Sequence, residues 1–333
     1  MSQKKTKYLV TGATGFIGPH LIRSLVSAGD KCMCLVRPDS NIEPLKNLDV
    51  EFAQGDITKK ESLRGVAEGV DCLIHMATLG HMNNFSVTED MFNSVNVSGT
   101  VNIMEEALKS KVKRVVHCSS VAAMGICNDL PATEKSICNP HHPYGRSKLK
   151  AENEVLKLVS DFDLPAVIIR FSMVYGPRDK RDMLKLARLA KKGLFPKIGS
   201  RQKLTPLIHV DDAVKGLLLA AKKGKKGAIY LLTNKQSEPF DRLRKIILNA
   251  LGIFRIPVFV PEWAALFTAS CMEKAFTLAG KSPPVSKKNI ESTLADRVFS
   301  IEKAEKELGF NPLVDPEKGL RETVLWYKDK GWM

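Results

Sequence analysis

Residues that can exchange a proton with a small molecule lie near the middle of the sequence. Tyr144 and Lys148 are four positions apart, and Ser119 and Ser120 end an apolar run upstream. Residues four apart on a helix project from one face. A nearby ammonium lowers the pKa of a tyrosine, ordinarily about 10, because it stabilises the phenolate. The pattern predicts that Tyr144 exchanges a proton with an alcohol or a carbonyl while Ser120 holds the oxygen by a hydrogen bond.

The Tyr-x-x-x-Lys spacing is distinctive within this chain. The residues four positions after the other tyrosines are Gly12, Asp179, Asn234 and Gly331. Ser119 and Ser120 alone would be interpreted as residues that end a strand or cap a helix. The combination of tyrosine, lysine and serine therefore carries the prediction, and Lys148 could also bind the ribose of a nicotinamide nucleotide.

A glycine-rich segment near residue 15 predicts a phosphate-binding turn, because it follows an apolar run and precedes a helical pattern. Gly12 suits a sharp turn, Gly15 lets the backbone approach a pyrophosphate, and Gly18 lets the helix pack on the strand. The free N–H groups and the dipole of the helix N-terminus attract the phosphates. The residues expected to contact the cofactor here are Gly12, Thr14, Gly15, Phe16, Ile17 and Gly18.

Two polar residues refine the cofactor prediction. Arg37 ends the second apolar run, where the adenosine ribose lies in dinucleotide-binding folds, and an arginine there can pair with a 2′-phosphate. An exposed arginine after a strand is also common, so the sequence favours NADP(H) and keeps NAD(H) as the alternative. Asp56 follows an apparent short strand between the apolar runs 32–36 and 72–76 and could accept a hydrogen bond from the adenine amino group.

Short apolar runs alternate with helical patterns up to about residue 175. The expected strands are 8–10, 32–36, 72–76, 112–118 and 166–170, and the expected helices are 19–28, 62–68, 97–109 and 144–160. Strands separated by helices in this way form parallel sheets through right-handed crossovers. The sequence therefore predicts an α/β fold, a doubly wound parallel-sheet Rossmann domain with a smaller C-terminal substrate-binding lobe.

The alternation loosens after Pro177. Helical patterns cover 183–192 and 211–223, and strands are expected at 204–210 and 228–232, the last at the edge of the sheet. We expect residues 1–175 to form the Rossmann domain, with 204–233 returning to it, and residues 176–203 and 234–333 to form the substrate-binding lobe.

The composition is that of a globular protein with a basic surface. The 333 residues carry a formal net charge of +15, with 44% hydrophobic residues. No nucleic-acid-binding motif or interleaved aromatic residue accompanies the lysine clusters, so we expect no nucleic-acid partner. The seven cysteines form no Cys-x-x-Cys pair, which predicts free thiols and no metal site. The polar start of the chain lacks a secretory signal pattern, which predicts a cytoplasmic protein.

Residues 256–272 are almost all apolar, interrupted by Pro257, Pro261 and Glu262. The run is shorter than the roughly 18 apolar residues of a membrane-spanning helix. We interpret the segment as a buried helix of the small lobe. The alternatives are a lid over an apolar substrate pocket and a helix at a membrane interface, which would make the protein membrane-associated.

Taken together, these patterns resemble the extended short-chain dehydrogenase/reductase family. That family includes nucleotide-sugar epimerases and dehydratases, dihydroflavonol reductases and 3-beta-hydroxysteroid dehydrogenase/isomerases. The matching segments cover most of the chain and are Thr11–Gly18, Asp56, His75–Ala77, Asn96–Thr100, Ser119–Ser120, Tyr144–Lys148, Arg170, Val174–Pro177 and His209–Asp212.

The resemblance implies roles for further residues. Ser120, rather than Ser119, matches the catalytic serine, and Asn96 matches an asparagine that supports the active-site helix and a proton-relay water. The residues that would line the cofactor are Ile57, Met76, Ala77 and Thr78, with Phe171 and Val174 beside the nicotinamide. Members of the family often form homodimers through two helices, which here correspond to 97–109 and 144–160.

Three features favour a reductase or dehydrogenase acting on an apolar, sterol-like or flavonol-like substrate. They are Arg37, the apolar residues 256–272, and a closing pattern around Asp296–Ser300 that resembles that branch. Arg178 and Arg201 could instead pair with a nucleotide diphosphate, which keeps a nucleotide-sugar epimerase as the alternative. A non-catalytic dinucleotide-binding sensor or scaffold is the alternative of another class.

Overall fold

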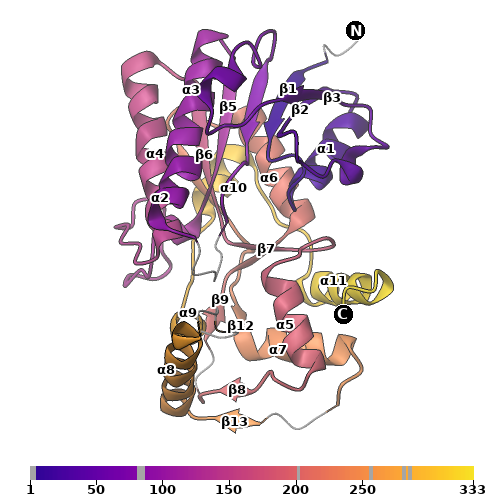
Figure 1. Cartoon of the computed structure of the whole chain (residues 1–333), viewed down its shortest axis with the longest axis vertical. Coiled ribbons are helices and arrows are strands. Elements are labelled where there is room, and N and C mark those ends of the chain that lie inside the picture. Colours follow the sequence, from indigo (N-terminus) through magenta and orange to yellow (C-terminus); the bar gives the residue numbers. More distant parts are fainter. Residues whose placement is uncertain (1–4, 81–86, 201–202, 255–257, 280–282, 284–286) are drawn as a thin grey trace.

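A seven-stranded parallel sheet forms the upper part of the molecule in Figure 1. In this computed structural model, residues 5–80, 87–200, 203–254, 258–279, 283 and 287–333 are described. The strands are β1 (Lys7–Thr11), β2 (Lys31–Val36), β3 (Glu51–Gln54), β4 (Cys72–His75), β5 (Arg114–Ser120), β6 (Ala166–Phe171) and β11 (Ile229–Leu232). Their order is β3-β2-β1-β4-β5-β6-β11, so the order reverses between β1 and β4. In such sheets ligands bind beyond the carboxyl ends of the strands at this reversal.

Helices cover both faces of the sheet, as Figure 1 shows. One apolar core holds Leu21 of α1 (Gly18–Ser27), Leu217 of α6 (Val210–Lys223) and Ala304 of α10 (Glu302–Leu308). The other core holds Ile103 of α3 (Gly99–Lys109) and Val155 of α4 (Pro143–Phe162). The predicted doubly wound α/β fold is confirmed.

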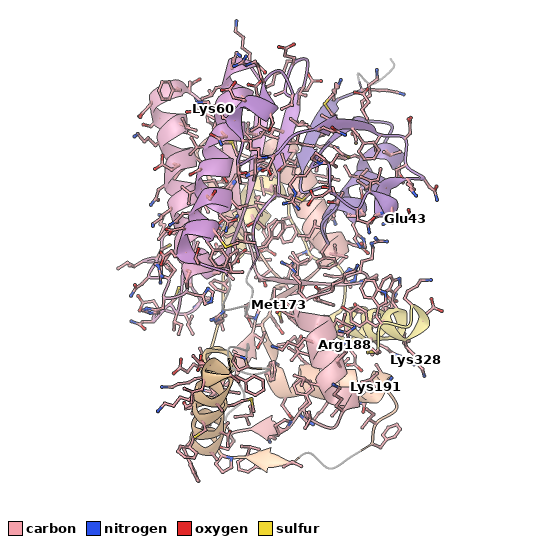
Figure 2. The ribbon with its side chains drawn as sticks, viewed as in Figure 1. Glu43, Lys60, Met173, Arg188, Lys191 and Lys328 are labelled. Atoms are coloured by element: carbon pink, nitrogen blue, oxygen red, sulfur yellow. The ribbon has the colours of Figure 1, made fainter. Side chains whose placement is uncertain are left out.

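The lower part of the molecule is built around a third apolar core. This core joins Leu184 of α5 (Asp182–Lys191), Ile247 of α7 (Phe240–Ala250) and Val324 of α11 (Pro316–Asp329). Three two-stranded sheets lie near it: β7 (Met173–Tyr175) with β10 (Leu207–His209), β9 (Leu204–Thr205) with β12 (Glu238–Pro239), and β8 (Lys197–Ile198) with β13 (Phe259–Val260). Met173 lies between the large sheet and this lower part (Figure 2).

The remaining described elements are short or peripheral. They are the 3-10 helices Glu43–Leu45, Lys60–Leu63 and Val121–Ala123, the π-helix Asn93–Ser98, and the helices α2 (Glu89–Phe92), α8 (Glu262–Leu278) and α9 (Lys287–Leu294). The π-helix runs directly into α3, so the two form one continuous helix. This helix carries Asn96 beneath the carboxyl edge of the sheet.

Two predicted elements differ from the structure. The helix expected at 62–68 is a 3-10 turn, Lys60–Leu63, because Gly65 and Gly69 both adopt positive φ values that break a helix. The strand expected at 204–210 is split at Pro206, which has no N–H to donate to a sheet, into β9 and β10. The strand expected at 228–232 is β11, at the edge of the sheet as predicted.

The interpretation of 256–272 as a buried helix is wrong for its described part. Residues 256 and 257 lie outside the described residues, and the helix α8 runs from Glu262 to Leu278. Only Ala265 and Ala269 of α8 are buried, whereas Trp263 is 73% and Phe267 is 65% exposed. Apolar composition predicts burial, but α8 packs on one side only, against α9 and the strands β8 and β13, and leaves its other face open. Among the described helices, none is long and apolar enough to cross a membrane.

Candidate active site

Ser120, Tyr144 and Lys148 come together at the carboxyl edge of the sheet, as predicted from their spacing. Ser120 is the last residue of β5, and Tyr144 lies in the first turn of α4. The side chains of Ser120 and Tyr144 share a hydrogen bond. Ser120 also accepts a hydrogen bond from the backbone N–H of Ala122 at 3.1 Å, which fixes its side chain at the end of the strand.

The start of α4 is held firmly, which positions Tyr144. Pro143 occupies the first turn, where its missing N–H costs no hydrogen bond. The ring of His142 accepts a hydrogen bond from the backbone N–H of Tyr144 at 3.1 Å. Arg146 donates two hydrogen bonds to Glu89 of α2, at 3.1 and 2.6 Å. These contacts tie the helix N-terminus to its neighbours and so fix the backbone that carries Tyr144.

Opposing influences act on the Tyr144 phenol. Burial raises its pKa, whereas the positive charge of Arg181 and the hydrogen bond with Ser120 lower it, and the pKa remains raised overall. Arg181, rather than the expected Lys148, is the cation whose charge acts most strongly on this phenol. Asp182 acts in the opposite sense and raises the pKa of Tyr144.

Lys148 is buried beneath the site, with 2% of its surface exposed. Its Nζ donates a hydrogen bond to the backbone oxygen of Cys118 at 2.6 Å. Burial lowers the pKa of Lys148 to about 8, because a charged ammonium is poorly solvated there. An ammonium has three N–H donors, so the residue can serve further acceptors.

Asn96 connects three segments of the site. Its Oδ1 accepts hydrogen bonds from Thr78 Oγ1 at 2.9 Å and from the backbone N–H of Leu79 at 2.7 Å. Its Nδ2 donates to the backbone oxygen of Leu79 at 3.1 Å and to Ser147 Oγ on α4 at 2.9 Å. Both amide hydrogens are therefore used by the protein. The arrangement suits a positioning residue that holds α4 against the loop after β4.

The glycine turn after β1 fits a dinucleotide pyrophosphate. Gly12 has φ +72°, and a Cβ at this position would lie 2.7 Å from the backbone nitrogen of Ala77. A Cβ at Gly18 would lie 2.1 Å from the backbone oxygen of Ala13, so α1 packs as closely as predicted. The first turn of α1 has no acidic residue and no side-chain cap. Its free N–H groups can therefore bind an anion.

The other residues predicted to contact the cofactor lie on the same turn, before the N-terminus of α1. Gly15 is exposed, Thr14, Phe16 and Ile17 are half-buried, and the Phe16 ring packs edge-on against His20 at 6.1 Å. This half-open surface lies where phosphates would approach the N-terminus of α1.

The predicted adenosine end brings Arg37 and Asp56 together. Arg37 has 60% of its side chain exposed, and its Nε lies 3.4 Å from Oδ1 of Asp39. Burial acts to raise the pKa of Asp56, but hydrogen bonds from Thr58 and the charge of Arg37 leave it lowered. Asp56 is therefore an anion that can accept a hydrogen bond.

The side chain of Ile57, which was expected to line the cofactor, lies in the apolar core. Its side chain is buried against α3, since a Cβ at Gly99 would lie 2.8 Å from it. Its backbone oxygen accepts a hydrogen bond from Asn102 at 2.8 Å. The side chain thus faces the core, and its backbone N–H is the group left for a ligand.

The remaining predicted cofactor residues lie along the carboxyl edge. Thr11 Oγ1 accepts a hydrogen bond from the N–H of Ala77 at 3.1 Å, which joins the ends of β1 and β4. Met76 and Ala77 are half-buried, and Thr78 is exposed. Phe171, at the end of β6, pairs in register with Ser120, and Val174 follows on β7.

A buried ion pair lies below the serine pair, and the sequence did not predict it. Nη2 and Nε of Arg170 donate to Glu152 at 2.7 and 3.1 Å, and both side chains are at most 3% exposed. Ser119 Oγ also donates to Glu152. Ser119 therefore faces α4, whereas Ser120 faces Tyr144. The catalytic role of Ser120 stays a prediction.

Two stacked histidines form a second buried support. His75 bonds Thr11 Oγ1 at 2.7 Å and Thr100 Oγ1 at 3.0 Å, and its ring stacks on His117 at 5.5 Å. Burial lowers the pKa of His75 to about 3, so this ring is neutral. The pair links β4 and β5 to α3 under Lys148.

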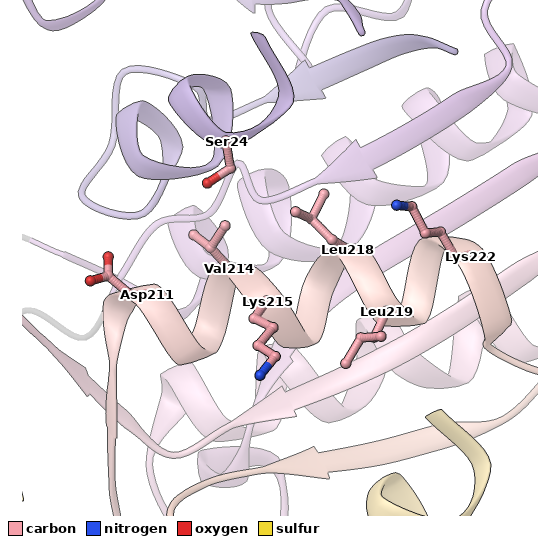
Figure 3. Close-up of a pocket in the computed structure, with 7 residues that line it drawn as sticks. All are labelled: Ser24, Asp211, Val214, Lys215, Leu218, Leu219 and Lys222. Carbon is pink, nitrogen blue, oxygen red and sulfur yellow. The ribbon is translucent and has the colours of Figure 1, made fainter. Parts of the chain in front are cut away.

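A surface pocket of about 280 Å³ lies elsewhere, between α1 and α6. Figure 3 shows Val214 and Leu218 pointing from α6 toward Ser24 of α1. The lining residues are Ser24, Asp211, Val214, Lys215, Leu218, Leu219 and Lys222, none of which belongs to the predicted site. This pocket is therefore separate from the candidate active site.

Comparison with known proteins agrees with this geometry. The sequence model of the NAD dependent epimerase/dehydratase family matches residues 8–232. A putative dihydroflavonol 4-reductase of Synechocystis is 28% identical, over 98% of this chain and 96% of its own. A decarboxylating sterol-4-alpha-carboxylate 3-dehydrogenase of Schizosaccharomyces pombe is 27% identical, over 96% of each chain.

A solved structure has the same overall fold. The dTDP-glucose 4,6-dehydratase of Streptomyces venezuelae, with NAD bound, has a TM-score of 0.79 and 26% identity, over 98% of each chain. The glycine turn and the edge where Ser120 meets Tyr144 fall within the matched residues 8–232. The chain thus belongs to the NAD-dependent epimerase/dehydratase family, and it is an NAD(P)-dependent enzyme of the extended short-chain dehydrogenase/reductase type.

Proposed function

We propose that this enzyme interconverts an alcohol and a carbonyl on an apolar, sterol-like or flavonol-like substrate, with Tyr144 as the acid and base. The observation that carries the proposal is the hydrogen bond between Ser120 and Tyr144 at the carboxyl edge of the sheet. The relatives named as a dihydroflavonol reductase and a sterol dehydrogenase support the substrate class.

Each residue has one task in the proposed mechanism. The nicotinamide, when bound, accepts or supplies the hydride. Ser120 donates a hydrogen bond to the substrate oxygen, and Tyr144 takes the alcohol proton during oxidation or returns it during reduction. Lys148 would donate hydrogen bonds to the nicotinamide ribose, and the positive charge of Arg181 favours the phenolate. Asn96 holds α4 against the loop after β4 through its hydrogen bonds with Leu79 and Ser147. The test is to incubate the enzyme and oxidised cofactor with a panel of apolar alcohols and to record the reduced cofactor that forms.

We further propose that NADP(H) is the preferred cofactor. Arg37 supports this choice because its side chain is 60% exposed and its guanidinium can pair with a 2′-phosphate. Asp39 opposes it, because its carboxylate lies beside the guanidinium and could accept a hydrogen bond from a ribose 2′-OH.

Replacing Arg37 tests this preference. We expect Arg37→Ala to weaken NADPH binding by about 10-fold or more, the loss of a charged hydrogen-bond pair, and NADH binding by less than about 3-fold. Fluorescence titration of the reduced cofactors measures both dissociation constants. Equal losses for the two cofactors would remove the case for NADP(H), and Lys46→Ala, an exposed cation nearby in sequence, is the matched control.

A nucleotide-sugar epimerase remains the second proposal. Residues 176–203 contain ten lysines and arginines and two aspartates, so this part of the lower lobe is strongly basic. Figure 2 shows Arg188 and Lys191 on α5 there. Such a segment could bind a diphosphate, although Arg201 lies outside the described residues. Epimerisation without net change in cofactor would favour this proposal.

We also propose that the enzyme is a homodimer through the outer faces of α3 and α4. These helices lie side by side on one side of the sheet in Figure 1. Phe162 at the end of α4 is 64% exposed, and Met91 on the adjacent α2 is 45% exposed, which supports an uncovered apolar contact. Light scattering should give the mass of two chains, and the mass of one chain would exclude the dimer.

The outer face of α8 is proposed to contact an anionic membrane surface. Trp263, Phe267, Cys271, Lys274 and Leu278 are exposed and follow one helical stripe. Figure 1 shows α8 at the lower end of the molecule, in the same lower part as the basic segment 176–203. Aromatic residues with nearby cations are typical of helices that rest on anionic lipid.

Vesicle flotation tests this contact. The unsubstituted protein should float with vesicles that contain phosphatidylserine. Trp263→Ser with Phe267→Ser should lower the bound fraction at least about 10-fold, since two large apolar side chains are lost. Leu313→Ser with Leu325→Ser, which removes exposed apolar residues elsewhere, should have no such effect. Flotation that is equal for both double variants would contradict the proposal.

A further inference from the structure

The loop between β7 and α5 leads into the first helix of the lower part of the molecule. We call residues 176–181 the bridging loop. Arg178 in this loop has φ +77°, a left-handed conformation that residues other than glycine rarely adopt. Asp179 is buried and accepts hydrogen bonds from the backbone N–H groups of Arg181 at 2.9 Å and Met183 at 3.2 Å. The bridging loop therefore has a defined shape and is fastened to the first turn of α5.

One side chain of the helix after the glycine turn reaches the bridging loop. His20 lies in the first turn of α1, and its Nε2 is 3.0 Å from the backbone oxygen of Pro177. A carbonyl oxygen only accepts hydrogen bonds, so Nε2 carries the hydrogen and donates it. His20 therefore joins the helix whose N-terminus can bind the pyrophosphate to the loop that begins the lower part of the molecule.

The surroundings of His20 favour this one hydrogen bond. Its side chain is 14% exposed, and its Nδ1 lies 3.7 Å from Oδ1 of Asp211, beyond hydrogen-bond distance. Burial lowers the pKa of His20, so the ring is neutral near pH 7 and forms no ion pair there. The ring of Phe16, in the glycine turn, packs edge-on against the His20 ring with 6.1 Å between their centroids. His20 is thus in contact with the glycine turn on one side and the bridging loop on the other.

The other end of the bridging loop also meets a segment expected to line the cofactor. A Cβ at Gly80 would lie 3.2 Å from Nη1 of Arg181, so this side chain lies against the loop after β4. That loop carries Ala77 and Thr78, which are predicted to contact the dinucleotide. The bridging loop therefore contacts the cofactor side of the molecule at both of its ends, through His20 and through Arg181.

We propose that His20 is a positioning residue that transmits cofactor binding to the lower part of the molecule. A dinucleotide that holds the glycine turn also holds α1, and the hydrogen bond from His20 to Pro177 then restrains the bridging loop and the start of α5. A segment ordered by one ligand costs a second ligand less entropy, so the bound cofactor prepares this part of the lower lobe for the substrate. The inference uses the dinucleotide site alone and is independent of which alcohol or sugar reacts.

Hydrogen–deuterium exchange with and without cofactor tests the inference. The probes are NADPH and NADH, each at a saturating concentration. In the wild type we expect the cofactor to slow amide exchange in the glycine turn and, as a second effect, in residues 176–191. The second slowing should be at least about 5-fold, the lower end of the usual coupling between two sites. No slowing in residues 176–191 of the wild type with either cofactor would overturn the inference.

Two amide variants separate the hydrogen bond from packing. His20→Gln places an amide N–H near the position of Nε2 and should keep the slowing in residues 176–191. His20→Asn places its amide near the position of Nδ1, toward Asp211, and should lose that slowing, as should His20→Leu. The slowing at the glycine turn should remain in all three variants, which shows that the cofactor is bound. Ser27→Ala, an exposed position at the other end of α1, is the matched control and should keep both effects.

The outcomes decide the role of His20 without reference to turnover. Slowing of residues 176–191 that persists in His20→Asn and His20→Leu would overturn the inference, because the cofactor would then act on them by another route. Equal loss in His20→Gln and His20→Asn would mean that packing of the ring, and not its hydrogen bond, carries the effect. Loss at the glycine turn as well would place the role of His20 in cofactor binding itself. Failure of the proposed alcohol oxidation would change none of these results.

Discussion

Tyr144→Phe is expected to lower kcat for NAD(P)-linked alcohol oxidation by about 10²- to 10⁴-fold, the usual contribution of a positioned acid or base. The substitution removes only the phenol oxygen, which shares a hydrogen bond with Ser120. The ring should keep its contact with Phe92, whose centroid lies 6.2 Å away. Binding of the reduced cofactor should therefore change little, as fluorescence titration would show.

Tyr327→Phe is the matched control for this experiment. Tyr327 on α11 is fully buried, and its hydroxyl has no hydrogen-bond partner among the described residues. Loss of that hydroxyl should leave both kcat and cofactor binding unchanged. If Tyr144→Phe retained the wild-type kcat on every accepted substrate, Tyr144 would not be the acid and base.

Arg170→Met is expected to cost about 3 to 5 kcal/mol of stability, because it leaves the Glu152 carboxylate buried without its cation. Glu152 is 1% exposed, so water cannot replace the lost partner. Ser119 would remain as one donor, which is not enough to solvate a carboxylate. Urea titration of the wild type and of Arg170→Met under the same conditions measures the difference in the free energy of unfolding.

A second substitution separates the lost ion pair from lost packing. Arg170→Met combined with Glu152→Leu replaces both charges by apolar groups and should recover most of the stability. Lys306→Met, in the exposed pair with Glu302, should leave the free energy of unfolding almost unchanged. A double variant as unstable as Arg170→Met alone would mean that packing, and not the buried charge, explains the loss.

Local patterns in the sequence were enough to predict the parts of the site that depend on neighbouring residues. The glycine turn requires Gly12 and Gly18 because backbone atoms lie where their side chains would be. The spacing of Tyr144 and Lys148 follows from one helix, α4. In each case the physical constraint acts over a few residues, and a single chain shows it.

Contacts between distant segments could not be predicted in this way. Arg181 acts on Tyr144 from a segment 37 positions later, and nothing in its own surroundings along the chain marks it. The position of Glu152 was easier to predict from the sequence, because it lies four residues after Lys148 on the same helix. Its partner Arg170, however, comes from β6. Such pairs depend on how strands and helices pack.

The apolar segment 256–272 shows a second limit. Its composition predicted a buried helix, but composition cannot tell how many neighbouring elements cover a helix. α8 meets α9 through small residues such as Ala265 and Ala269 and leaves Trp263 exposed. The exposed stripe, rather than the apolar content, is the feature that a membrane contact would use.

The most direct test of the proposed function follows the cofactor during turnover. Purified enzyme is incubated with oxidised NADP or NAD and a panel of apolar alcohols or nucleotide sugars, and the absorbance of free reduced nicotinamide is recorded with the carbonyl product. An oxidoreductase should accumulate reduced cofactor and carbonyl in equal amounts with an apolar alcohol, and Tyr144→Phe should abolish this. Epimerisation of a nucleotide sugar with no net cofactor reduction on any alcohol would contradict the proposed reaction.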